Sequence, residues 1–182
     1  INRAIQGVYS PGSSFKVIGS LAGLENGVDP AKPTECLGHF FLGPIDFECW
    51  NKGGHGDMNL REAITMSCNV YFYTLGARIG GGKMAEMAEA FGLGKITGIP
   101  LDHESPGLLP TEEWKRKKNP RDRWTTGDSV NMVIGQGSLG VTPLQMAVVA
   151  AAMANGGTVF QPRLILRVET SEGETITDFP PA

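Results

Sequence analysis

Residues 9–16 read Tyr9-Ser10-Pro11-Gly12-Ser13-Ser14-Phe15-Lys16, and this stretch decides how the first part of the chain folds. Ser13 follows a Pro-Gly pair and is expected to cap a helix that runs to the Asn26-Gly27 stop. Apolar residues recur at helical spacing along it, namely Phe15, Val17, Ile18, Leu21 and Leu24. In such a helix Ser13 and Lys16 lie on one face, so their side chains can touch.

The Ser13 and Lys16 pair offers a nucleophile and a base. A serine hydroxyl reacts poorly until a neighbour takes its proton, and a lysine can do so only when its pKa is lowered. The helix N-terminus adds backbone N–H groups that favour a developing oxyanion. The spacing alone also fits an N-cap serine followed by an exposed lysine, so other motifs must decide.

The composition is that of one globular domain or part of one. The chain has 182 residues, of which 41% are hydrophobic, enough for one packed core. Its net charge of −3 lacks the basic excess of a nucleic-acid-binding protein, so no nucleic acid is expected as a partner. Residues 146–154 form the longest apolar run, well short of the ~20 residues that a membrane-spanning helix needs. The chain starts without Met, so we expect a piece of a longer protein, with any anchor or export signal elsewhere.

Beyond the first helix, the patterning is mainly helical. Further helices are predicted at residues 60–64, 70–79, 83–91, 111–114 and 142–155. Residues 28–58 are rich in glycine and proline, have no regular period and are expected to be irregular. The pattern at the end predicts a hairpin of strands 162–170 and 175–179. The basic residues 115–118 come shortly after two glutamates, and we expect them to form a solvent-exposed helix face.

Several motifs follow one another along the chain. They are residues 9–16, the triplet Ser67-Cys68-Asn69, the turn Ile134-Gly135-Gln136-Gly137, and Thr142-Pro143-Leu144-Gln145-Met146. Together they resemble the class B penicillin-binding proteins, the D,D-transpeptidases that cross-link peptidoglycan. Residues 49–56 and 67–73 resemble most the members that serve cell elongation. The resemblance covers nearly the whole chain and implies an α+β fold of the serine transpeptidase and β-lactamase type.

This resemblance implies roles for four residues. Ser13 would be the acylated nucleophile, Lys16 would take its proton, and Ser67 would relay protons between Lys16 and the leaving amine. Asn69 would hydrogen-bond the amide of the bound peptide or of a β-lactam. The backbone N–H of Ser13 would form half of the oxyanion hole, while Ser14 points elsewhere on the helix.

The resemblance also implies a setting for the protein. Its substrates would be peptidoglycan stem peptides, and β-lactams would inhibit it. Its partners would be a membrane glycosyltransferase and the elongation machinery. It would act on the periplasmic side of the bacterial inner membrane, anchored by an N-terminal segment that is not in this sequence.

One family motif is missing from the sequence. The family carries a K-[ST]-G strand opposite the serine, and no such tripeptide occurs between residues 1 and 182. Residues 95–98 contain one residue too many, and residues 124–127 lack a lysine. We therefore expect a partial transpeptidase domain over residues 1–182, mainly its helical region, and impaired catalysis by this piece alone.

The cysteines suggest a metal site. Cys36, Cys49, His55 and Cys68 form a C-x12-C-x5-H-x12-C series that uses every cysteine, and three thiolates with one imidazole suit structural zinc. A Cys36–Cys49 disulfide with a buried Cys68 is the alternative, and His39 is a rival fourth ligand. The resemblance supports zinc, because members of the elongation group carry a metal site in this region. Cys68 would then face away from the cleft and fix the catalytic turn from behind.

Two rival functions also fit the sequence. A D,D-carboxypeptidase or β-lactamase-like hydrolase would pass the acyl group to water, although no deacylating carboxylate is recognised. A β-lactam sensor or a zinc-stapled interaction module would not turn over. No cofactor is expected to take part in the reaction itself.

Overall fold

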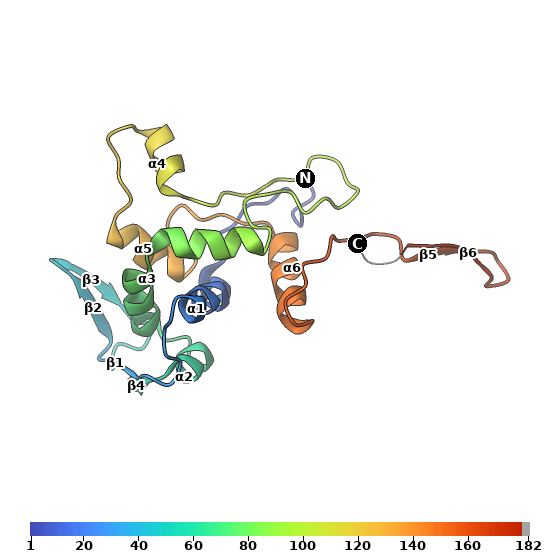
Figure 1. Cartoon of the computed structure of the whole chain (residues 1–182). Helices are drawn as coiled ribbons and strands as arrows, with labels where there is room; N and C mark the ends of the chain where they lie inside the picture. Colours follow the sequence, from blue (N-terminus) through green and yellow to red (C-terminus); the bar gives the residue numbers. More distant parts are fainter. Residues whose placement is uncertain (180–182) are drawn as a thin grey trace.

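The structure is a computed structural model that describes residues 1–179. Helices form its main body, with α3 packed against both α1 and α5 (Figure 1). The helical elements are the 3-10 turn η1 (Gly12–Phe15) and the helices α1 (Lys16–Glu25), α2 (Leu60–Thr65), α3 (Asn69–Ala90), α4 (Glu112–Lys118), α5 (Thr126–Val133) and α6 (Pro143–Ala154).

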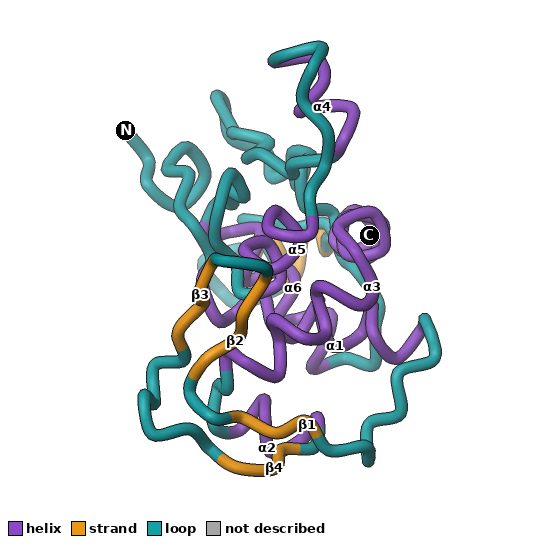
Figure 2. Tube along the Cα trace, turned by 90° about the vertical axis from the view of Figure 1, so that its left-hand side faces the viewer, coloured by secondary structure: helices purple, strands orange, loops and turns teal. Residues whose placement is uncertain are grey.

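The strands pair into three separate two-stranded antiparallel sheets within the described residues. These pairs are β1 (Thr34–Cys36) with β4 (Gly56–Met58), β2 (His39–Leu42) with β3 (Ile45–Glu48), and β5 (Arg167–Glu169) with β6 (Thr175–Asp178). Figure 2 shows the first four strands and α2 gathered beside the helical body. The mixture of helices with short sheets confirms the predicted α+β class.

Glycines let three helices approach closely. A Cβ atom added to Gly19 of α1 would lie 2.8 Å from the Val133 side chain. A Cβ atom added to Gly76 of α3 would lie 2.8 Å from Ser129 O. Because both positions lack a side chain, α1 and α3 press directly against α5. Phe15 and Phe72 fill the adjoining core and are fully buried.

Most predicted helices are confirmed, and their caps explain where they begin. Thr142 and Gln145 form a capping box at the start of α6, with Pro143 at its first position. Asn59 caps α2 in the same way with Glu62. The two helices predicted at 70–79 and 83–91 are joined in α3 and separated by a break at Gly80, where φ is 78°.

Other sequence expectations were wrong. Ser13 does not cap a helix, because it lies inside η1, whose cap position is Pro11. Residues 28–58 are not wholly irregular, since they contain β1 to β4. The helix α5 was not predicted. The predicted C-terminal hairpin is present as β5 and β6, but β5 spans only Arg167–Glu169 of the expected strand 162–170.

The C-terminal hairpin projects from the body. Both β5 and β6 are exposed along their whole length (Figure 1). Apolar side chains on and near it are open to solvent, namely Leu164, Ile165, Leu166, Val168, Ile176 and Phe179. None of the described helices has both the length and the apolar character needed to cross a membrane.

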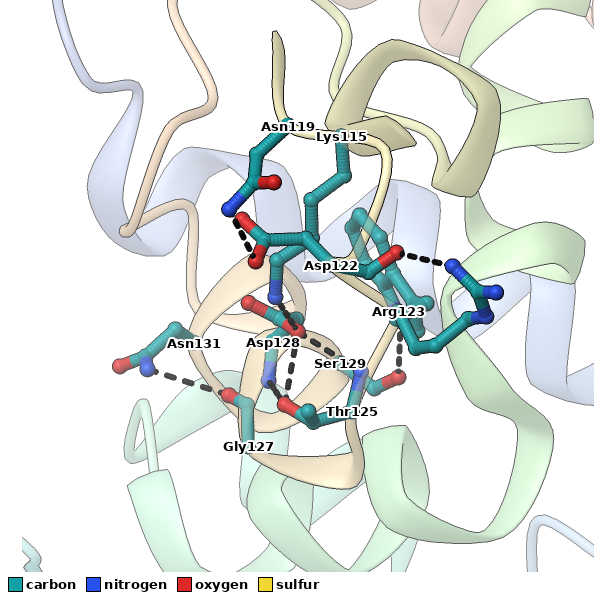
Figure 3. A network of polar contacts seen from close by, with 10 residues as sticks. Lys115, Asn119, Asp122, Arg123, Thr125, Gly127, Asp128, Ser129 and Asn131 are labelled. Atoms are coloured by element: carbon teal, nitrogen blue, oxygen red, sulfur yellow. Dashed lines mark hydrogen bonds and ion pairs between the residues drawn. The ribbon is translucent and has the colours of Figure 1, made fainter. Parts of the chain in front are cut away.

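Helix α4 is fixed to the body by one of its basic residues. Lys115 donates a 2.5 Å hydrogen bond to Asp128, which also forms the capping box of α5 with Thr125 (Figure 3). The basic run is therefore not wholly a solvated face. Lys117 does match the expectation, since it is exposed and pairs with Glu113 on the same helix.

Candidate active site and metal centre

Three predicted residues form a continuous hydrogen-bonded chain. The Nζ of Lys16 donates to Ser67 Oγ at 3.0 Å, and Ser67 Oγ donates to Ser13 Oγ at 3.0 Å. Among the described residues Lys16 and Ser13 share no direct hydrogen bond, so Ser67 bridges them. The structure thus brings together residues from η1, α1 and the turn between α2 and α3.

Asn69 belongs to the same cluster. Its Oδ1 accepts from Lys16 Nζ at 2.7 Å, and the carbonyl of Ser67 accepts from the same amine at 2.8 Å. Lys16 therefore has three acceptors around one ammonium group. Ser14 lies outside the cluster, because its hydroxyl donates to Pro11 O at 2.7 Å.

The surroundings of Lys16 lower its pKa, which favours its action as a base. The Nζ atom of Lys16 lies over the Phe72 ring, 5.3 Å from the ring centroid, and the residue is only 2% exposed. Burial lowers the pKa of Lys16 to about 8, although negative charge at Cys49 and Cys68 raises it in part. A much larger fraction of the amine is neutral near physiological pH than for an ordinary lysine.

The turn that carries Ser67 is held in an unusual backbone conformation. Ser67 has φ of 49°, in the left-handed region that residues with side chains seldom adopt. The N–H of Ser67 donates to Ile64 O and that of Cys68 to Ala63 O, which ties the turn to α2. Trp50 Nε1 donates to Met66 O at 3.1 Å and supports the turn from the loop after β3. This supporting role of Trp50 was not predicted from the sequence, and no local pattern signals it.

The four predicted metal ligands lie close together, and one of them, Cys68, belongs to this turn. The ligand atoms of Cys36, Cys49, His55 and Cys68 lie within 4.8 Å of one another, and the three cysteines are buried free thiols. His55 Nδ1 lies 3.5 Å from Cys36 Sγ and 3.6 Å from Cys49 Sγ.

These distances fit zinc. With zinc–sulfur bonds of about 2.3 Å and zinc–nitrogen bonds of about 2.0–2.1 Å, tetrahedral angles place the two ligand atoms about 3.5–3.6 Å apart. Three soft thiols and one imidazole are also the donor set of structural zinc sites. The cluster therefore suits zinc by geometry and by chemistry.

His39 is not part of this cluster. It lies on β2, where its Nδ1 is 2.8 Å from Asp46 Oδ2 and its ring stacks on Phe41. Of the two histidines considered as the fourth ligand, the structure thus places His55 with the cysteines and His39 elsewhere.

Comparison with known proteins connects this arrangement to a family. The family model for the "Penicillin binding protein transpeptidase domain" matches residues 1–181. The chain is 39% identical to "Peptidoglycan D,D-transpeptidase MrdA" of Acinetobacter baumannii, a match covering 98% of this chain and 27% of that protein. The chain thus spans about a quarter of the length of this curated relative.

Solved structures show the same likeness. The chain superposes on penicillin-binding protein 2 (PBP2) in its complex with MreC from Helicobacter pylori with a TM-score of 0.86 and 31% identity. That match covers 100% of this chain and 32% of the other. Against Pseudomonas aeruginosa PBP2 in complex with WCK 5153, the TM-score is 0.85 and the identity 34%, over 100% of this chain and 41% of the other.

Proposed function

Because the chain belongs to the penicillin-binding protein transpeptidase family and is similar to its PBP2 members, we propose that the protein containing it is a peptidoglycan D,D-transpeptidase. Residues 1–182 would form part of one transpeptidase domain. The observation that carries the proposal is the hydrogen-bonded chain from Lys16 through Ser67 to Ser13.

In this proposal Ser13 Oγ attacks the carbonyl of a D-alanyl peptide or of a β-lactam. A carbon–oxygen bond forms to Ser13 and the amide carbon–nitrogen bond breaks. The Ser13 proton passes through Ser67 to the neutral amine of Lys16, and then returns through Ser67 to the leaving nitrogen. Each hydroxyl can both donate and accept, so rotation reverses the direction of the two bonds.

The second half-reaction uses the same groups. An acceptor amine attacks the acyl carbon, its proton passes to Lys16, and the Ser13 oxygen leaves and is reprotonated. Asn69 accepts from Lys16 through Oδ1, so its amide N–H groups remain to donate to the substrate. The backbone N–H of Ser13 would donate to the oxyanion.

We propose a structural zinc ion bound by Cys36, Cys49, His55 and Cys68. When bound, it would cross-link the β1 to β4 region to the turn before α3. Cys68 separates Ser67 from Asn69 in the chain and is fully buried, so this cross-link would hold both residues against Lys16.

The setting of the protein is also proposed. The Helicobacter pylori PBP2 structure is a complex with MreC, which supports a partner from the elongation machinery for this protein as well. Because peptidoglycan lies outside the cytoplasm, the site would act on the periplasmic side of the inner membrane, beside a membrane glycosyltransferase.

A transfer assay tests the proposed function. The full-length protein is acylated by a D-alanyl peptide substrate and offered an amine acceptor. Formation of the cross-linked amide supports a transpeptidase. Release of only the hydrolysed peptide would favour the carboxypeptidase alternative, and a stable acyl-enzyme without turnover would favour a sensor.

Acylation should depend on pH through Lys16. Below its pKa of about 8 the amine already carries a proton and cannot accept another, so the acylation rate constant should fall by ~tenfold per pH unit as the pH decreases. Above about pH 8 the rate constant should level off. Stopped-flow acylation by a chromogenic β-lactam measures it, and equal rate constants well below and well above this pH would contradict the assignment.

The isolated 182-residue chain should be acylated slowly by β-lactams. Its sequence contains no K-[ST]-G motif, which in the family provides the second oxyanion donor and a cation for the substrate carboxylate. Loss of one oxyanion donor costs roughly 10²–10³ in rate. Labelling of this chain at the rate of the full-length protein would show that the motif is dispensable.

A further inference from the structure

The residue before the proposed nucleophile is held by the turn that follows α5. The N–H of Gly12 donates to Gly135 O at 3.0 Å. Gly135 is itself tied to α5, because its N–H donates to Met132 O at 2.8 Å. One backbone contact thus links α5 to the residue beside Ser13.

The contact leaves no room for a side chain. Gly135 has φ of 70°, and a Cβ on it would lie 2.1 Å from Gly12 O and 2.6 Å from Gly12 N. Such distances do not occur for real Cβ atoms, and the opposing atoms are backbone that cannot rotate away. Any L-residue larger than glycine would have to push the backbone of Gly12 and Gly135 apart.

The helix behind Gly135 is well anchored. At its start, Asp128 and Thr125 form the capping box, and Lys115 joins Asp128 from α4 (Figure 3). Near its end, Val133 is buried against Gly19 and Gly76 of the neighbouring helices. Since α5 has little freedom to yield, the strain of a side chain at Gly135 should fall on the turn that carries Ser13.

We infer that Gly135 is a positioning residue for Ser13, which holds the nucleophile at hydrogen-bond distance from Ser67. The inference rests on the proposed acylation of Ser13. Lys16, Ser67 and Asn69 make none of their hydrogen bonds to this turn, so the effect should fall on the placement of Ser13 alone. A misplacement of about 1 Å can cost on the order of 100-fold in rate.

The experiment compares Gly135→Ala with Gly92→Ala in the full-length protein. Gly92 is the matched control, because it has φ of 81° but no atom within 4 Å of an added Cβ. Both changes therefore carry the backbone cost of a left-handed alanine, and only Gly135→Ala also carries the clash. Thermal unfolding checks the fold, and β-lactam kinetics separate the dissociation constant before acylation from the acylation rate constant.

For Gly135→Ala the acylation rate constant should fall by about 10–100-fold, while the dissociation constant changes by less than about threefold. Gly92→Ala should keep a rate constant within about twofold of the unmodified protein. The inference is overturned if Gly135→Ala acylates at the unmodified rate, or if Gly92→Ala is slowed as much. If the unmodified protein is not acylated at Ser13 at all, the proposed function fails and not this contact alone.

If Gly135→Ala does not fold, amide hydrogen exchange in the unmodified protein tests the inference instead. In the unmodified protein the Gly12 amide should exchange as slowly as amides inside α5, because its bond to Gly135 opens only when the turn moves. Exchange as fast as that of the exposed hairpin amide of Gly173 would overturn the inference.

Discussion

Replacing Ser13 by alanine is expected to abolish covalent labelling of the full-length protein by penicillin. The change removes the oxygen that forms the acyl bond, and the neighbouring Ser14 hydroxyl should not replace it, because it donates a hydrogen bond to Pro11 O. The rate constant should fall by about 10⁴-fold or more, as in other serine acyl-transfer enzymes. Fluorescent penicillin and gel electrophoresis measure the loss.

Lys16→Ala should be nearly as severe. Without the amine, the proton of Ser13 has no acceptor beyond Ser67, and the Ser13 and Lys16 changes together should cost little more than either alone. Ser14→Ala is the matched control and should label at close to the unmodified rate. Normal labelling of Ser13→Ala, or loss of labelling in Ser14→Ala, would contradict the assignment of the nucleophile.

Replacing His55 by alanine should release the proposed zinc ion and destabilise the protein. The unmodified protein is expected to contain about one zinc per chain. Because structural zinc binding is coupled to folding, loss of a ligand should lower the unfolding free energy by on the order of 4 kcal/mol. Elemental analysis and thermal unfolding measure the two effects.

The other two histidines provide matched controls. His39→Ala and His103→Ala should keep the zinc, since neither side chain lies in the cysteine cluster.

Cys68→Ser should also slow acylation, because Cys68 lies between Ser67 and Asn69. Protein purified without chelator that contains no metal, or a mapped disulfide between Cys36 and Cys49, would contradict the zinc site.

The sequence was most informative where local spacing determines structure. The sequence predicted a helical segment from Ser13 to Asn26, and η1 and α1 follow one another from Gly12 to Glu25; Thr142-Pro143 marked the start of α6. The order of the motifs and the cysteine spacing singled out residues that the structure brings together. These features depend on short-range geometry or on a shared family pattern.

Long-range packing could not be predicted in this way. The sequence does not show that Ser67 bridges Lys16 and Ser13, because that contact depends on how the turn before α3 meets η1. The helix α5 was missed because Gly127 weakens its helical pattern, although Thr125 and Asp128 are spaced as a capping box. Residues 28–58 hold short strands without clear alternation, since few of their side chains enter the core.

Peptide mapping of the full-length protein after reaction with a β-lactam tests the central claim most directly. Mass spectrometry of the digested adduct should locate one β-lactam per chain on the hydroxyl of Ser13, in the peptide that also contains Ser14. An adduct on Ser14, Ser67 or any other residue, or no adduct at all, would contradict the account.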